Sequence, residues 1–130
     1  MLDTNHASPL VTIGHPLRTK ILESGAKGDT FALCVPVIVE TKFGMGILPR
    51  AKSNLEEWQR LKALLTTYAL DAHDADLAVD LQLSLRKIGR QLASFDALIA
   101  AIALRYDLIL LTTDKDFQAI EELRTDNWLI

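Results

Sequence analysis

Short β-rich segments alternate with helical segments along the whole chain, and this alternation restricts the possible folds more than any other feature. The clearest strand is LILLTTD (108–114), in which apolar and β-branched residues lead to a polar end. TFALCV (30–35) has the same character, and shorter strands are expected at 1–3, 66–71 and 123–128. Strands separated by helices predict an α/β fold with a mostly parallel central sheet of four or five strands.

Prolines, glycines and polar caps mark the ends of the predicted helices. The SNLE sequence (53–56) matches a capping box, in which Ser53 and Glu56 each accept a hydrogen bond from the other residue's backbone. Ser8-Pro9 resembles an N-cap followed by a first helical residue. Together these signals predict helices that begin near residue 8 and at 16–24, 36–46, 53–65, 74–88, 94–107 and 115–120.

Size and composition indicate one domain that covers residues 1–130. Cys34 is the only cysteine, so no internal disulfide can form, and a reducing cytoplasmic location is expected. No signal peptide is visible, and no apolar run approaches the roughly 20 residues that a membrane span needs. The net charge of −3 does not indicate a nucleic-acid-binding protein, although acids that hold a metal would lower the charge by themselves.

Four acids lie where solvated helix faces do not account for them. Asp3 and Asp114 follow predicted strands, and the carboxyl ends of parallel strands are where open sheets bind ligands. Glu40 lies within the apolar helical stretch PVIVETKFG, where an unpaired charge is costly. Asp96 lies in the first turn of the most apolar helix, SFDALIAA. All four positions fit one edge of one sheet.

Each of these acids also has a purely structural explanation. Asp3 fits a cap or turn, and Asp114 is a common residue at the end of a strand. Asp96 interacts favourably with a helix dipole, by about 0.3–1 kcal/mol. The four acids therefore indicate a site only as a set.

Converging carboxylates repel one another, and a cation relieves that repulsion. A like-charge pair at about 4 Å costs roughly 1 kcal/mol in water and about 4 kcal/mol at an effective dielectric constant of 20. Oxygen ligands suit Mg²⁺ or Mn²⁺, whereas the scattered His6, His15 and His73 do not have zinc spacing. Sites of this kind act on phosphate esters by activating a water molecule and stabilising the leaving oxygen.

With these motifs the chain resembles the PIN domain family and, within it, the toxin subunits of VapBC-type toxin–antitoxin pairs. The resemblance extends nearly from end to end through LDTN, VIVETKFG, GRQLASFDALIAAIAL, LLTTDKDF and NWL. It places Asp3, Glu40, Asp96 and Asp114 at the family's acidic quartet. It implies a three-layer α/β/α fold, Mg²⁺ or Mn²⁺ dependence and ribonuclease activity. It also implies a homodimer and inhibition by a cognate antitoxin.

Other polar residues beside the quartet are candidates to support it. Asn5 and Thr4 follow Asp3, and Thr113 precedes Asp114; these residues could orient a carboxylate or a water, or simply cap a turn. Asp116, two residues after Asp114, could assist the metal or cap the short helix. The chain departs from the family in three places. The first strand has only two residues before Asp3, Cys34-Val35-Pro36 replaces a region that often contains a hydroxyl, and QLASF replaces a loop that more commonly contains proline or glycine.

Basic and apolar residues indicate where RNA and protein partners would bind. The basic residues near predicted helix ends could contact RNA phosphates or simply be solvated. These residues are Arg18, Lys20, Lys42, Arg50, Lys52, Arg86, Lys87 and Arg90. A set of apolar residues could either pack in the core or form a surface for a second copy of the chain or for the antitoxin. These residues are Leu10, Val11, Ile13, Trp58, Leu61 and Leu65. No residue pattern identifies the RNA sequence that is cut.

Three other functions compete with a ribonuclease. A phosphohydrolase of the haloacid-dehalogenase type needs a second aspartate two residues after the first, where this chain has Asn5. A receiver-like signalling domain needs paired acids after the first strand, and that pair is missing, although Asp71 and Lys115 give it faint support. A catalytically degenerate PIN scaffold that only binds protein or RNA is the third, and the complete quartet argues against it.

Overall fold

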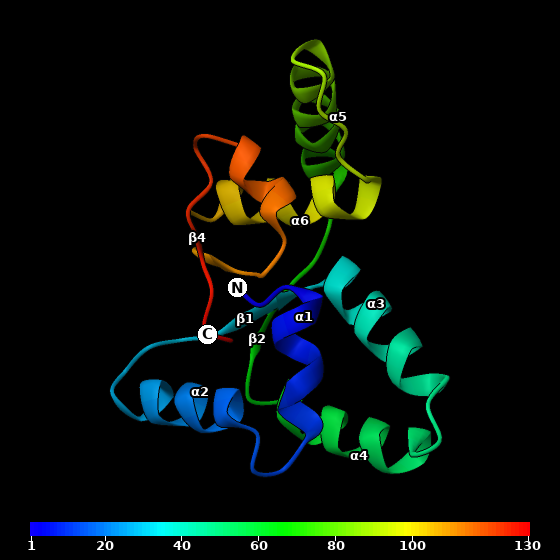
Figure 1. Cartoon of the computed structure of the whole chain (residues 1–130), viewed down its shortest axis with the longest axis vertical. Coiled ribbons are helices and arrows are strands. Elements are labelled where there is room, and N and C mark those ends of the chain that lie inside the picture. Colours follow the sequence, from blue (N-terminus) through cyan, green and yellow to red (C-terminus); the bar gives the residue numbers. More distant parts are fainter.

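The computed structural model describes residues 1–130, and its strands lie between two groups of helices (Figure 1). On one side α5 (Ala72–Lys87) packs against α6 (Ser94–Arg105). The second group consists of α1 (Thr4–Ala7), the 3-10 helix η1 (Ser8–Val11), α2 (Pro16–Ala26), α3 (Val35–Gly46) and α4 (Ala51–Lys62). The expected three-layer α/β/α architecture is confirmed.

The strands are short and all pair in parallel. β1 (Ala32–Cys34) pairs with β2 (Thr66–Tyr68), and β3 (Leu110–Leu111) pairs with β4 (Thr125–Asp126). The first residues of the chain join the two pairs. The Leu2 N–H donates to the Ala32 carbonyl at 2.9 Å, and the Leu111 N–H donates to the Met1 carbonyl at 2.8 Å. Hydrogen bonds on both sides therefore hold the short segment that leads to Asp3.

Helix α6 lies at the centre of the core, as its almost uniformly apolar sequence predicts. Five consecutive residues of this helix, 99–103, are buried. Trp58 of α4 is fully buried, and Leu10 of η1 is 3% exposed, so both side chains fill the core. A dimer or antitoxin surface is thereby excluded for these two residues. Val11, Leu61 and Leu65 pack partly against the core, and Ile13 is 80% exposed.

Several predicted boundaries differ from those in the structure. α4 begins at Ala51 after an N-cap, Arg50, whose side chain makes no capping bond, so the SNLE capping box does not form. Ser8 is the C-cap of α1 and the first residue of η1, and it is not an N-cap, because the chain is already helical from Thr4. The last strand contains only two residues, β4. η2 (Lys115–Ala119) forms where a short helix was expected, as a 3-10 helix. No helix combines the length and apolar character that a membrane span requires.

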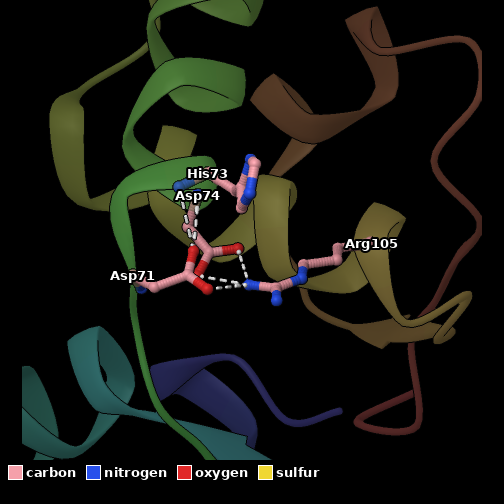
Figure 2. Close-up of polar contacts among 4 residues, drawn as sticks. All are labelled: Asp71, His73, Asp74 and Arg105. Carbon is pink, nitrogen blue, oxygen red and sulfur yellow. Dashed lines mark hydrogen bonds and ion pairs between the residues drawn. The ribbon is translucent and has the colours of Figure 1, made fainter.

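A capping box forms instead at the start of α5, where its two carboxylates also form ion pairs with Arg105 (Figure 2). The Asp71 carboxylate accepts from the Asp74 N–H, and the Asp74 carboxylate accepts from the Asp71 N–H. Asp74 is fully buried, and both of its oxygens accept from the Arg105 guanidinium of α6 at 3.1 Å. Figure 2 shows both carboxylates pointing toward Arg105, whereas the His73 ring points away. This ion pair therefore joins the two helices of one layer.

Candidate active site

Asp3 is both a helix cap and the most buried acid of the predicted quartet. Its Oδ1 accepts from the Thr4 N–H at 2.8 Å and so caps α1. Its Oδ2 accepts from the Thr112 hydroxyl at 2.7 Å and from the Asn5 amide at 3.1 Å. The side chain is 5% exposed, and an unpaired carboxylate at that depth would be costly. These hydrogen bonds satisfy it and fix its direction.

Glu40 reaches the same region from the first half of α3. Its Oε1 accepts a hydrogen bond from the Thr4 hydroxyl at 3.0 Å, so α1 and α3 are joined at this point. The absence of a hydroxyl in Cys34-Val35-Pro36 is thereby offset, because Thr4 supplies one from the other segment. Glu40 is only partly buried, which leaves its second oxygen to solvent or to a ligand.

Thr112, not Thr113, connects Asp114 to Asp3. The Thr112 hydroxyl donates to Asp3, and the same oxygen accepts from the Asp114 N–H at 3.0 Å. Thr113 is exposed, and only its backbone N–H contributes, by donating to the Asn5 side-chain oxygen at 3.2 Å. Residues 112 and 114 lie two apart in an extended segment, so they point to the same face while 113 points away. That periodicity in the sequence could have identified Thr112.

Asp114 is also the N-cap of η2, where its carboxylate accepts from the Asp116 N–H at 2.9 Å. Asp116 is exposed, and no hydrogen bond of its carboxylate draws it toward the quartet. It acts on the site through its negative charge alone.

Asp96 shows that the predicted acids influence one another electrostatically. It lies in the first turn of α6, where burial is the largest cause of a raised pKa. The charges of Asp114, Asp3, Glu40 and Asp116 act in the same direction, and together with burial they raise the pKa of Asp96 to about 6. α1, α3, α6 and the end of β3 therefore bring the four acids to one edge of the sheet, as the sequence predicts for parallel strands.

The donor chemistry suits a hard divalent cation, but the carboxylates do not close around one point. No group of three of them comes close enough to ligate a single ion as the side chains are placed. All the donors are oxygen atoms, and the pKa of Asp96 is raised first by burial and then by the charges of the other acids, which a cation would offset. The residues present therefore fit Mg²⁺ or Mn²⁺ in the kind of donor that they offer.

The raised pKa of Asp96 predicts that the metal-free protein loses stability as the pH rises from about 4 to 6. The folded state keeps a proton on Asp96 up to pH 6, whereas an unfolded aspartate loses it near 3.8, so the unfolded state binds fewer protons across that interval. The loss is expected to be about 1 kcal/mol, after discounting for solvent around a half-exposed carboxylate. Urea unfolding with EDTA at several pH values measures it; an equal loss in Asp96→Asn would contradict this assignment.

Comparison with known proteins agrees with this fold. The model of the PIN domain family matches residues 1–123. A crystal structure of VapBC2 from Rickettsia felis, bound to a DNA fragment from their promoter, is 24% identical, covers 98% of this chain and 97% of that chain, and has a TM-score of 0.86. A toxin–antitoxin complex from Klebsiella pneumoniae is 22% identical over 94% of this chain and 92% of that chain, with a TM-score of 0.68.

A third similar structure is Mycobacterium tuberculosis VapC20, described as a Sarcin-Ricin loop cleaving toxin. It is 16% identical over 92% of this chain and 93% of that chain, with a TM-score of 0.68. Comparison with curated protein sequences finds no significant match. At these identities the solved structures share the fold, whereas the family model covers nearly the whole chain. This protein therefore belongs to the PIN domain family.

Proposed function

We propose that this protein is a Mg²⁺- or Mn²⁺-dependent endoribonuclease and the toxin of a type II toxin–antitoxin pair. The observation that carries the proposal is the convergence of four acids from four separate segments, with a raised pKa at Asp96 that the charges of the other three help to cause. Structural roles such as capping explain the acids singly but not their common location. Membership of the PIN domain family supports the same conclusion.

In this proposal Asp3, Glu40, Asp96 and Asp114 hold the cation, directly or through water. When bound, the cation would lower the pKa of an attacking water and stabilise the leaving oxygen. Asp3 is the fixed member, because hydrogen bonds hold both of its oxygens. Thr4 orients Glu40 through its hydroxyl. The Thr112 hydroxyl lies between the Asp114 N–H and the Asp3 carboxylate and bonds both. Asn5 supports Asp3 through its amide, while Thr113 supports Asn5 through its backbone N–H.

The substrate and partner follow from the similar structures only as proposals. VapC20 is described as cleaving the Sarcin-Ricin loop, which is RNA, and the Klebsiella structure is a toxin–antitoxin complex. We extend RNA as the substrate class, and an antitoxin as the inhibitor, to this chain. A homodimer is also proposed. α3 offers a surface for a protein partner, since Val35, Val39 and Phe43 are spaced by four residues along it and are 37%, 49% and 70% exposed.

The decisive experiment is a titration of the purified chain, free of any partner, with Mg²⁺ and then Mn²⁺ while RNA cleavage is followed. Cleavage that depends on the cation and stops with EDTA is expected. Tight RNA or protein binding without cleavage at any cation concentration would instead support the degenerate scaffold. Size-exclusion chromatography with light scattering tests the homodimer, and a strict monomer at high concentration would contradict it.

A basic hollow beside the start of α6 is a candidate phosphate contact for the RNA. Arg86 and Arg90 line a hollow of about 590 Å³ at the end of α5, and neither guanidinium takes part in an ion pair. Gln82 donates to the Leu92 carbonyl at 3.0 Å and to the Ser94 hydroxyl at 3.3 Å, which ties this wall to the helix that carries Asp96. An RNA strand whose scissile phosphate lies at the acids can therefore extend across the two arginines.

The double variant Arg86→Gln/Arg90→Gln is expected to raise KM for RNA and leave kcat nearly unchanged, because the arginines hold phosphates away from the reacting bond. The slope of log affinity against log salt should fall by about 0.7 for each phosphate that the protein no longer binds. The matched control is Arg60→Gln/Arg124→Gln, which removes the same charge from two exposed arginines that pair with acids. An equal rise of KM in the control would show that the effect comes from the change in net charge and not from phosphate contacts of Arg86 and Arg90.

A further inference from the structure

We infer that His6 is a positioning residue that orients the Asp3 carboxylate through Asn5 and ties it to the C-terminal segment at Trp128. This inference rests on the proposed function, because the orientation of Asp3 matters to the extent that Asp3 holds a cation. The sequence assigns no role to His6, whose spacing from the other histidines does not suit a zinc site. Its position in the structure is different, since its ring is fully buried and both ring nitrogens have partners.

A continuous chain of hydrogen bonds runs from the backbone of Trp128 to Asp3. The Trp128 N–H lies 3.1 Å from His6 Nε2, and His6 Nδ1 lies 2.6 Å from the side-chain oxygen of Asn5. The Asn5 amide nitrogen then lies 3.1 Å from Oδ2 of Asp3. α1 makes this possible because it begins directly after Asp3 and places Asn5 and His6 in its single turn.

Two backbone N–H groups determine the direction of every bond in this chain. A backbone N–H can only donate, so Nε2 of His6 must accept from Trp128, and the proton of the neutral ring lies on Nδ1. The Thr113 N–H likewise requires an oxygen, which identifies the Asn5 atom at 3.2 Å as Oδ1. Nδ1–H of His6 therefore donates to that oxygen, and the Asn5 amide must present its N–H to Asp3. Burial lowers the pKa of His6, in keeping with a neutral ring.

The far end of the chain of hydrogen bonds is firmly anchored. The Trp128 ring packs edge-on against Phe31 at 5.6 Å between centroids, and its Nε1 donates to Asp126 at 3.0 Å. Its carbonyl accepts from Lys20 of α2 at 3.1 Å. His6 therefore connects Asn5 to a partly buried residue that three contacts hold in place.

Loss of the His6 donor changes what Asn5 can present to Asp3. With Nδ1–H in place, a flipped Asn5 amide would direct its N–H₂ at another donor and its oxygen at the Asp3 carboxylate. Without it, the flip no longer brings two donors together at His6. The flip is then opposed by the Thr113 N–H at 3.2 Å and by the contacts of the Asn5 amide nitrogen with Oδ2 of Asp3 at 3.1 Å and with the Thr112 hydroxyl at 3.4 Å. Partners that orient a metal ligand in this way typically account for about 10–100-fold in metal affinity or activity.

Two variants separate positioning from packing, because asparagine and glutamine each replace one ring nitrogen. His6→Asn places an amide near the Nδ1 position and keeps the donor to Asn5, although it leaves the larger cavity. His6→Gln places its amide near the Nε2 position, so it keeps the acceptor for Trp128 and loses the donor. Mn²⁺ affinity by electron paramagnetic resonance, the unfolding midpoint, and the ¹⁵N side-chain amide signals of Asn5 are measured for both, together with RNA cleavage.

His6→Gln is expected to bind Mn²⁺ roughly 10-fold more weakly and to lose about the same factor in kcat, whereas His6→Asn loses clearly less, because it gives up the bond from Trp128 but keeps the donor to Asn5. His6→Gln should add no further loss in an Asn5→Ala background. Equal losses in both variants, or a larger loss in His6→Asn, would follow from packing and overturn the inference. If the wild type neither binds Mn²⁺ nor cuts RNA, the proposed function fails. The Asn5 amide signals still test the inferred role of His6 in that case, because they should shift more in His6→Gln than in His6→Asn.

Discussion

Asp96→Asn is expected to lower metal-dependent RNA cleavage by at least about 100-fold and, at the same time, to raise the melting temperature of the metal-free protein at about pH 7.5. Activity falls because a ligand to the cation is lost, and metal ions supply several kcal/mol of stabilisation in such reactions. Stability rises because burial, together with the like charges around it, disfavours the ionised form of Asp96 and raises its pKa to about 6. Removing its charge removes that repulsion, and a gain of a few degrees is expected.

Cleavage of a labelled RNA and thermal unfolding in EDTA measure the two effects on one preparation. Asp80→Asn is the control, because this exposed acid of α5 carries the same charge away from the quartet. Asp3→Asn is expected to lose cleavage as strongly but without the gain in stability, since its hydrogen bonds stabilise the folded state. Both variants should keep the circular dichroism of the wild type. Full activity in Asp96→Asn would exclude the proposed quartet.

Arg105→Met is expected to lower the melting temperature by roughly 10 °C, the largest effect on stability that we predict for one substitution outside the site. The substitution keeps most of the apolar stem and leaves the fully buried Asp74 without its cation. A buried carboxylate that loses its partner is among the most destabilising changes in proteins. The same ion pair joins α5 to α6 (Figure 2).

The double variant Arg105→Met/Asp74→Asn distinguishes an unpaired charge from impaired packing. Asparagine keeps an oxygen for the Asp71 N–H of the capping box and removes the buried charge, so the double variant should melt above Arg105→Met alone. Arg60→Met is the matched control, because the Arg60 side chain is 71% exposed and surface pairs of this kind contribute little. A double variant that melts below the single one would show that packing dominates.

The fold class and the segments that carry the acids could be predicted because both depend on local patterns. The strand–helix alternation, the uniformly apolar α6 and the placement of Asp3 and Asp114 after strands are all visible in windows of about ten residues. The SNLE box was wrong for the same reason, since α4 had begun earlier, at Ala51, and Ser53 was no longer at its end. Whether Trp58 belongs to the core or to a surface stayed open, because an apolar stripe does not tell which neighbours cover it.

The order of strands and helices along the chain was enough to predict that the acids lie at one edge of the sheet, because the carboxyl ends of parallel strands meet there. How each acid is held depends on contacts that form only in the folded chain. Thr4 reaches Glu40, Thr112 reaches Asp3, and Trp128 reaches His6, across 36, 109 and 122 positions of sequence. Hydrogen bonds act over about 3 Å in space and carry no trace in local sequence pattern, so only the folded chain reveals these partners.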